Sequence, residues 1–303
     1  SRRAQRQLSR PEVNGTRLIA PIGDDSAHAL QLAWLQVQAH AATAPPSHIV
    51  AFGGLLPLMA APIFAAWLGC PLITLLRGND WDLGLLSAQR QPLLAAAIER
   101  SAMVCTVTSQ HQRQVQALFP KAQVTWVPNS VDPADWEPLP IHIQQAAAWR
   151  ATHAADSRLV LGMFGHLKAK KGLEVLLTAL ATPTIRERVT LYMVGTIDEA
   201  GAAALATHPE LAVVHEPFAS RLRLPACYRS CDIIALPSFY DGMPNVLLEA
   251  GCCELPILAS ATGGMADVLT AGSLSFGELF TPGDSAACRV ALQRVLALPK
   301  NQL

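Results

Sequence analysis

Two carboxylates stand eight residues apart in the segment PSFYDGMPNVLLEAG, at Asp241 and Glu249. The apolar run CDIIALPS before them predicts a buried strand, and Pro244 with NVLLEAGCC predicts a helix after it. Asp241 then lies in the loop beyond the strand, and Glu249 lies more than one turn inside the helix. Carboxylates accept hydrogen bonds from hydroxyl groups, so this pair could hold two sugar hydroxyls. The alternative is a helix cap at Asp241 and a solvated face at Glu249.

Two further segments could hold an anion, because each follows a predicted strand and opens a helix. In FGHLKAKKGLEVLLTAL, Lys171 closes a cluster of lysines and Gly172 begins an amphipathic pattern. In ATGGMADVL, Gly263 and Gly264 could present bare backbone N–H groups. Lysine ammonium groups and helix-start amides both suit phosphate. A solvated loop and an ordinary strand-to-helix turn are the alternatives.

Polar residues also follow predicted strands in the first half of the chain. Asn79 and Asp80 lie in RGNDWD, and Asn129 lies in VPNSVD. Each could line a cleft or cap a helix. The acidic pair Asp24 and Asp25 is better explained as an Asx turn before the helix AHALQLAWLQVQ than as a metal site.

The composition excludes several classes of protein. The 303 residues carry 23 basic and 23 acidic side chains, so nothing in the charge balance predicts a nucleic-acid partner. The cysteine count is odd, and several cysteines lie in apolar runs, which predicts reduced thiols in a cytoplasmic protein. CYRSC could be half of a zinc site, but no second Cys/His pair has ligand spacing, so no metal is expected. Residues 49–76 carry no charge, yet their prolines and glycines favour strand, turn, helix and strand over a membrane span, and peripheral membrane contact is left open.

Apolar runs that alternate with helical patterns predict the fold class. They indicate parallel strands buried on both faces, hence an α/β protein with two Rossmann-like domains facing across a cleft. We place the first domain at residues 1–140 and the second at 141–303, joined by a linker and helix within 132–157. The predicted strands are 17–23, 48–52, 71–78, 103–109, 124–130, 158–165, 189–195, 211–218, 231–238 and 255–260.

Taken together, these segments resemble the family 4 glycosyltransferases, which have the GT-B fold. The resemblance runs from about residue 47 to 285 and rests on KAKKGLEVLL, IIALPSFYDGMPNVLLEAGCCELPILAS and GGMADV, with VPNSVD as an interdomain element. It implies a retaining hexosyltransferase that uses a nucleotide diphosphate sugar, needs no metal or other cofactor, and acts on a carbohydrate or lipid-linked acceptor. It also implies a shortened acceptor-side first domain, because both ends of the family pattern are missing.

The resemblance also implies roles for individual residues. Glu249 would hold the ribose of the donor, Asp241 would lie near the donor sugar, and Lys171 would contact the diphosphate. The catalytic set implied is Asp241, Lys171 and His166; the donor-binding set is Glu249, Gly263, Gly264, Gly242, Met243, Pro244 and Asn245; and the acceptor or cleft set is Asn79, Asp80 and Asn129.

Three positions depart from the family pattern. Asp241 stands where the family usually has Glu, His166 where it has Arg, and Ser130 where it has Gly. These departures keep two alternatives open. One is a non-catalytic nucleotide-sugar-binding or scaffold protein of the same fold, and the other is a GT-B epimerase acting on a nucleotide sugar.

Overall fold

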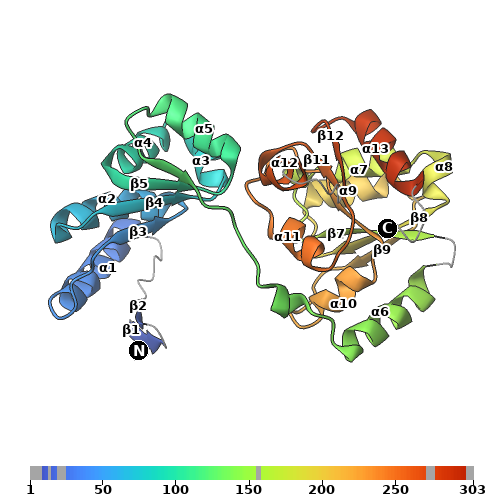
Figure 1. Cartoon of the computed structure of the whole chain (residues 1–303), viewed down its shortest axis with the longest axis horizontal. Helices are drawn as coiled ribbons and strands as arrows, with labels where there is room; N and C mark the ends of the chain where they lie inside the picture. The colour runs from blue at the N-terminus through green and yellow to red at the C-terminus, as the bar shows by residue number, and fades with distance from the viewer. Residues whose placement is uncertain (1–8, 13–14, 19–24, 155–157, 271–276, 298–303) are drawn as a thin grey trace. The chain divides into compact units, whose positions relative to one another are not determined.

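The computed structural model of the chain describes residues 9–12, 15–18, 25–154, 158–270 and 277–297 (Figure 1). The chain divides into two compact units. The first comprises Ser1–Thr106 and Gln112–Trp126, and the second comprises Val107–His111 and Val127–Leu303. Residues 127–140, which the sequence interpretation placed in the first domain, group with the second unit, where Trp136 packs edge-on against Tyr228.

The first unit is built on a parallel sheet whose strands follow chain order, β3-β4-β5-β6. Parallel strands need long crossovers, and helices supply them here. The strands are β3 (Ile49–Phe52), β4 (Leu72–Leu76), β5 (Ser101–Thr106) and β6 (Val124–Trp126). The helices are α1 (Ser26–Ala41), α2 (Leu55–Leu68), α3 (Asn79–Leu85), α4 (Gln91–Arg100) and α5 (Ser109–Leu118).

The core of the first unit lies between this sheet and its helices. Trp81 of α3 and Ile98 of α4 are fully buried there beside Leu76 of β4. Asp25 caps α1, because its side chain accepts a 3.0 Å hydrogen bond from the amide of His28. Asp25 is thus the N-cap of the helix that the sequence predicted after an Asx turn, and Asp24 lies outside the described residues.

The second unit holds a six-stranded parallel sheet in the order β12-β11-β10-β7-β8-β9. Counted along the chain from β7, the order is 3-2-1-4-5-6, which is that of a Rossmann fold. The order reverses between β7 and β10, so the connections after these two neighbours leave to opposite sides. The strands are β7 (Leu159–Phe164), β8 (Val189–Val194), β9 (Val213–Glu216), β10 (Ile233–Leu236), β11 (Ile257–Ser260) and β12 (Gly277–Phe280).

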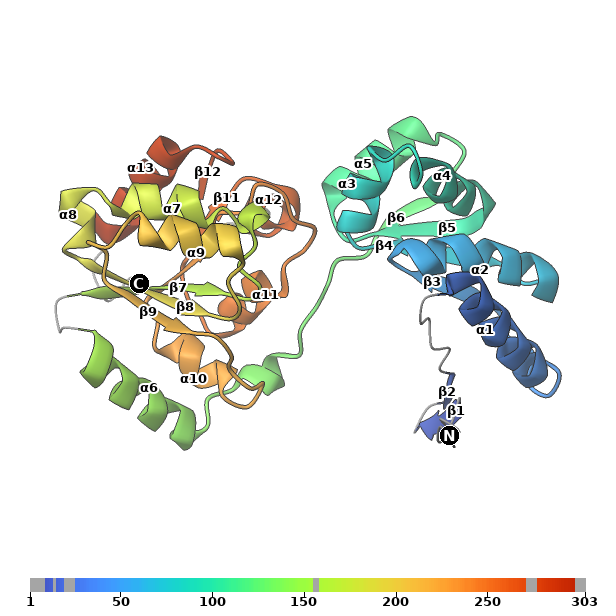
Figure 2. The same ribbon diagram turned by 180° about the vertical axis from the view of Figure 1, so that it is seen from behind.

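Helices cover both faces of this sheet, so most of its central strand residues are buried (Figure 2). One face packs against α7 (Leu173–Leu180), α8 (Pro183–Arg186), α9 (Glu199–Ala206) and α13 (Ser285–Ala297). The other packs against α6 (Pro140–His153), α10 (Leu224–Arg229) and α11 (Asn245–Cys252). The short α12 (Gly263–Thr270) follows β11.

The two parallel-sheet units confirm the predicted α/β class. The strand β12 had no sequence prediction, and residues 19–23 of the first predicted strand lie outside the described residues. Residues 17 and 18 pair instead in a small antiparallel hairpin of β1 (Ser9–Glu12) and β2 (Gly15–Leu18). Among the helices that the structure describes, none combines the length and the apolar character needed to cross a bilayer.

Candidate functional site

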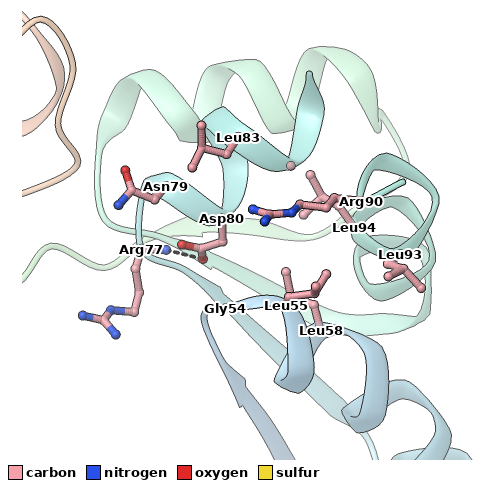
Figure 3. Close-up of a pocket in the computed structure, with 11 residues that line it drawn as sticks. Gly54, Leu55, Leu58, Arg77, Asn79, Asp80, Leu83, Arg90, Leu93 and Leu94 are labelled. Carbon is pink, nitrogen blue, oxygen red and sulfur yellow. Dashed lines mark hydrogen bonds between the residues drawn. The ribbon is translucent and has the colours of Figure 1, made fainter. Parts of the chain in front are cut away.

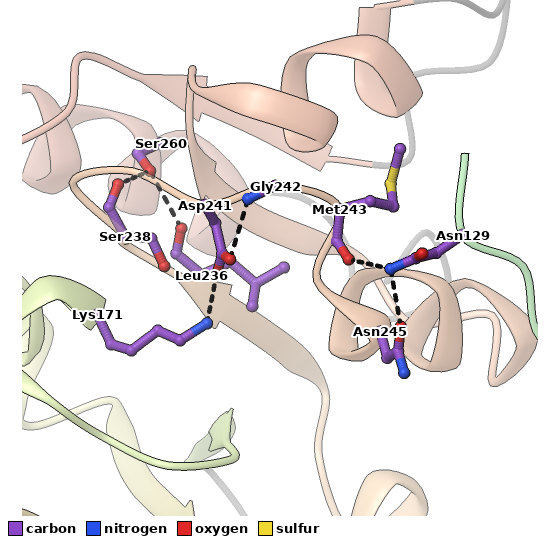
Figure 4. A network of polar contacts seen from close by, with 9 residues as sticks. All are labelled: Asn129, Lys171, Leu236, Ser238, Asp241, Gly242, Met243, Asn245 and Ser260. Atoms are coloured by element: carbon purple, nitrogen blue, oxygen red, sulfur yellow. Dashed lines mark hydrogen bonds and ion pairs between the residues drawn. The ribbon is translucent and has the colours of Figure 1, made fainter. Parts of the chain in front are cut away.

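The strand order of the second unit brings the two most informative loops together. β7 and β10 are neighbours and run in parallel, so the loops that follow them leave from the same edge of the sheet. The loop after β7 carries Lys171, and the loop after β10 carries Asp241. The ammonium of Lys171 forms a salt bridge with Oδ2 of Asp241 (Figure 4).

This salt bridge is largely shielded from water, since the side chains of Lys171 and Asp241 are 22% and 16% exposed. Gly172 allows the loops after β7 and β10 to come into direct contact. It has a left-handed backbone with φ of 70°, and a Cβ there would lie 2.0 Å from the carbonyl oxygen of Pro237. The sequence therefore needs glycine next to Lys171 because the two loops touch at that point.

The glycine pair at the start of α12 also supports the Asp241 loop. A Cβ on Gly263 would lie 1.9 Å from the carbonyl oxygen of Asp241, so backbone meets backbone there. The amide of Gly264 donates a 2.7 Å hydrogen bond to the carbonyl of Gly242. That amide is therefore already engaged within the protein, which leaves Gly263 as the candidate backbone donor to a phosphate.

Asn129 reaches the same loop from the segment that precedes η1 (Pro133–Trp136). Its amide nitrogen donates to the carbonyl of Met243 at 2.7 Å and to Oδ1 of Asn245 at 3.3 Å (Figure 4). Pro244 is the N-cap residue of α11, one position before the first turn where the sequence placed it. Asn129 thus ties the start of α11 to the chain that enters the second unit.

Glu249 lies within α11, and a tyrosine holds one of its oxygens. The hydroxyl of Tyr228 donates to Oε2 of Glu249 at 2.6 Å. The ring of Tyr228 stacks on Phe164 with centroids 4.2 Å apart and meets Trp136 edge-on at 5.4 Å. Burial and the charge of the nearby Glu249 carboxylate raise the pKa of Tyr228 well above its usual range, so this hydroxyl remains a donor.

A pocket of about 380 Å³ lies beside Glu249 at the carboxyl ends of β7, β8 and β9. His166 lines it from the loop after β7, and Thr196 from the loop after β8. Phe218, 77% exposed, lies on its wall after β9. The sequence-predicted residues Glu249 and His166 therefore share one pocket, in the position where open parallel sheets bind ligands.

An ion pair supports the wall that carries Phe218. Arg223 donates to both oxygens of Glu216, at 2.8 and 3.0 Å, and the hydroxyl of Tyr192 donates to Oε2 at 2.7 Å. Burial alone would raise the pKa of Glu216, but these hydrogen bonds and the guanidinium charge outweigh it and lower that pKa. The ionised Glu216 thus closes the segment 216–223 into a fixed loop.

The first-unit candidates Asn79 and Asp80 line a different cavity, one formed within that unit alone. Oδ2 of Asp80 accepts a 2.8 Å hydrogen bond from the amide of Arg77, so one oxygen serves as a local cap. Within the described part of the chain, no three His, Cys, Asp or Glu side chains gather at metal-binding distances. Cys227 and Cys231, which the sequence suggested as half of a zinc site, are buried free thiols.

Sequence reasoning missed Tyr228, which lies within the CYRSC segment that drew attention for its cysteines. Its contact with Glu249 joins α10 to α11 across 21 residues of chain, and no local pattern signals it. It also missed Arg77 and Arg90, which line the first-unit cavity.

Comparison with known proteins extends these observations. Residues 158–297 match the family model described as glycosyl transferases group 1. A D-inositol 3-phosphate glycosyltransferase of Stackebrandtia nassauensis is 30% identical over 164 residues, which cover 50% of this chain and 36% of the relative. An uncharacterized glycosyltransferase of Methanocaldococcus jannaschii is 24% identical and covers 56% of this chain and 45% of the relative. The chain therefore spans less than half the length of these curated relatives.

Solved structures share the architecture. HepE of Anabaena in complex with UDP and glucose superimposes with a TM-score of 0.71 at 20% identity, covering 88% of this chain and 72% of HepE. The sucrose-phosphate synthase of Thermosynechococcus elongatus gives 0.73 at 19% identity, with 96% and 76% covered. Residues 158–297 are thus similar to the glycosyl transferases group 1 family, and the chain shares the GT-B fold of these solved structures.

Proposed function

We propose that this chain transfers a hexose from a nucleotide diphosphate sugar to a carbohydrate or lipid-linked acceptor, with retention of anomeric configuration and without a metal ion. The observation that carries the proposal is the pocket beside Glu249. It presents an ionisable carboxylate, oriented by Tyr228, at the carboxyl edge of a Rossmann-type sheet. The names of the relatives support glycosyl transfer, and the UDP and UDP-glucose complexes of HepE support this donor class.

In this proposal each site residue contacts a different part of the donor. Glu249 accepts hydrogen bonds from the ribose hydroxyls. Lys171, with the amide of Gly263, faces the diphosphate, and Asp241 lies near the donor sugar. Departure of a nucleoside diphosphate builds negative charge, and a fixed cation stabilises such charge most effectively where water is excluded. Because Lys171 forms a salt bridge with Asp241, a diphosphate would compete with that carboxylate for the ammonium.

Turnover assays test the activity. The full chain is incubated with UDP-, GDP- and ADP-hexoses, alone and with a panel of sugar and lipid-linked acceptors. We expect release of one nucleoside diphosphate and formation of a glycoside, and NMR of the product gives its anomeric configuration. Binding without glycoside formation would favour the non-catalytic alternative, and an isomerised donor would favour the epimerase.

A binding assay tests the role of Glu249 separately. The Glu249→Gln variant keeps the size of the side chain but replaces one acceptor oxygen with an amide donor. Affinity for the ribonucleoside diphosphate should fall by about 1.5–3 kcal/mol, the range for hydrogen bonds to a charged group. A dideoxyribonucleotide should bind both proteins equally, because it lacks the hydroxyls. Unchanged ribonucleotide affinity would remove Glu249 from the donor site.

A further inference from the structure

The helix α2 of the first unit contains no charged, amide or hydroxyl side chain, and its sequence is LLPLMAAPIFAAWL. One side of it packs on the sheet and on neighbouring helices, where Leu58, Ala61 and Ala65 are buried. Leu58 also lines the first-unit cavity, which Figure 3 shows from close by. A helix that is apolar all round is normally buried all round, so its other side needs an explanation.

The opposite side of α2 is exposed to solvent although it is entirely apolar. We call it the apolar face of α2; it consists of residues at helical spacing, none of which is buried: Leu56, Met59, Ile63, Ala66 and Trp67. Ile63 is 40% exposed and Trp67 is 61% exposed. In contrast, α5 exposes the polar residues Gln110, Arg113 and Gln116, as a helix facing water usually does.

An aromatic cluster holds Trp67 in place. It joins α2 to α1, and the two helices lie side by side in both views (Figures 1 and 2). The ring centroid of Trp34 lies 4.6 Å from that of Trp67 and 5.2 Å from that of Phe64. Trp67 is therefore oriented by its neighbours while it remains largely exposed. A tryptophan has an apolar body and one polar N–H group, which suits the boundary between water and hydrocarbon.

The segment that carries the apolar face has no formal charge. No Asp, Glu, Lys or Arg occurs from residue 26 to residue 76, a stretch that contains both helices and the strands β3 and β4. The residues Gln31, Leu35 and Gln38, which α1 exposes, are neutral as well. This segment can therefore form no ion pair with a charged partner. An electrically neutral, apolar partner matches it best.

The dimensions of α2 favour a lipid surface over a membrane span and over a protein partner. Its 14 residues extend about 21 Å, whereas the hydrocarbon core of a bilayer is about 30 Å thick. α2 also contacts β3 and β4, so it offers only one side. A stable protein interface uses about 20–30 residues a side, far more than this face provides. A helix that lies in the plane of a bilayer needs only one apolar side.

We propose that the apolar face of α2 is a docking surface for a zwitterionic lipid bilayer, with Trp67 as its anchor. Ile63 and Trp67 enter the boundary between head groups and acyl chains, and the indole N–H of Trp67 donates to the head-group layer. Burial of apolar side chains drives the contact, because the segment has no cation that could attract anionic lipids. The inference goes beyond the proposed transfer reaction and does not depend on it.

Co-sedimentation of the full chain with vesicles tests the proposal, without any nucleotide present. We expect binding to vesicles of pure phosphatidylcholine, with similar affinity at low and high salt, because screening weakens only interactions between charges. Replacing part of the lipid with phosphatidylglycerol should leave the affinity unchanged. A chain that does not bind phosphatidylcholine, or that binds only anionic vesicles and is released by salt, would overturn the assignment.

Variants locate the contact. Trp67→Ser should weaken vesicle binding about tenfold or more, because a tryptophan side chain buries a large apolar area, and Ile63→Ser should weaken it less. Leu118→Ser is the control, since Leu118 is 54% exposed on α5 and lies outside the apolar face. It is more exposed than Ile63, yet its replacement should leave binding unchanged. Unfolding midpoints in urea show whether each variant is folded. Equal vesicle affinities in a folded Trp67→Ser variant and wild type would refute the anchor.

Two further measurements separate the rival explanations. Sedimentation velocity without vesicles should give the same species for wild type and Trp67→Ser. A smaller species in the variant would show that a second copy of the chain covers the face, and the bilayer assignment would fail. UDP affinity should be the same in both proteins. If wild type binds vesicles but not UDP, the donor proposal fails and the docking surface stands; if it binds UDP but no vesicles, the reverse holds.

Discussion

The hydroxyl of Tyr228 and the Oε2 atom of Glu249 are 2.6 Å apart, and the tyrosine donates the hydrogen bond. Tyr228 is fully buried by its aromatic neighbours, while Glu249 is half-buried at the pocket. The buried ring therefore fixes the carboxylate in one orientation before any ligand arrives. A carboxylate fixed in advance loses less conformational freedom when it binds.

Replacing Tyr228 with Phe should weaken binding of a ribonucleoside diphosphate by about 1 kcal/mol, the typical net worth of one hydrogen bond. The ring and its contact with Phe164 remain, so the unfolding midpoint in urea should change little. Calorimetry with ribo- and dideoxyribonucleotides checks this result. A purely structural role for the hydroxyl would weaken both ligands equally, whereas a positioning role weakens only the ribonucleotide.

The salt bridge between Lys171 and Asp241 predicts opposite effects for its two partners. Lys171→Ala should weaken UDP binding by about 1.5–3 kcal/mol, because a charge-assisted contact is lost. Asp241→Asn should strengthen UDP binding, because the ammonium no longer has a competing carboxylate. Lys168→Ala is the control, since Lys168 is an exposed lysine of the same loop. Weaker UDP binding in Asp241→Asn would contradict the competition.

The cluster of Glu216, Arg223 and Tyr192 predicts a specific acid response. The pKa of Glu216 is below its ordinary value of 4.5, so its ionised form stabilises the folded state at pH values above 4.5. That contribution is lost as the pH falls from there through the lowered pKa. Between neutral pH and about pH 3, wild type should lose more unfolding free energy than Glu216→Gln, as urea titrations can measure.

An exposed ion pair serves as the control for this acid response. Arg221 and Asp135 are 76% and 53% exposed, and such pairs contribute little to stability. Asp135→Asn should therefore lose stability in acid in parallel with wild type. A parallel loss in Glu216→Gln as well would show that the Glu216 cluster does not contribute.

Replacing Gly172 with any larger residue should cause a large loss of stability. An alanine there would adopt a left-handed backbone and place its Cβ 2.0 Å from the Pro237 carbonyl oxygen. We expect Gly172→Ala to destabilise the protein by more than about 2 kcal/mol, because backbone on both sides must shift. Gly251→Ala is the control in α11, where a Cβ would meet no atom within 4 Å. It should be neutral or stabilise by up to about 1 kcal/mol.

Much of the fold could be predicted because buried parallel strands are continuous apolar runs. CDIIALPS is one such run, and β10 lies inside it. The short GELF, which forms β12, could not be found this way, since its strand residues are mostly half-buried at the sheet edge. Contacts between distant segments set the partners of each site residue, so sequence placed Glu249 on its helix but did not reveal Tyr228.

The boundary between the two units also depends on contacts between distant segments, which the sequence does not reveal. The prolines and tryptophans of residues 132–157 predict a linker and one helix, and the structure forms η1 and α6 there. Trp136 is nevertheless 5% exposed and packs against Tyr228, far along the chain. Local composition identifies where regular structure ends, but not which core the connecting residues join.

All residues that line the pocket beside Glu249 lie after residue 163, within one uninterrupted stretch of the second unit. The cavity with Arg77 and Arg90 lies wholly before residue 95. A single genetic crossover between residues 127 and 132 would transplant either pocket intact into another chain. The two pockets can therefore be inherited separately, because no residue that lines one of them is encoded on the other side of this point.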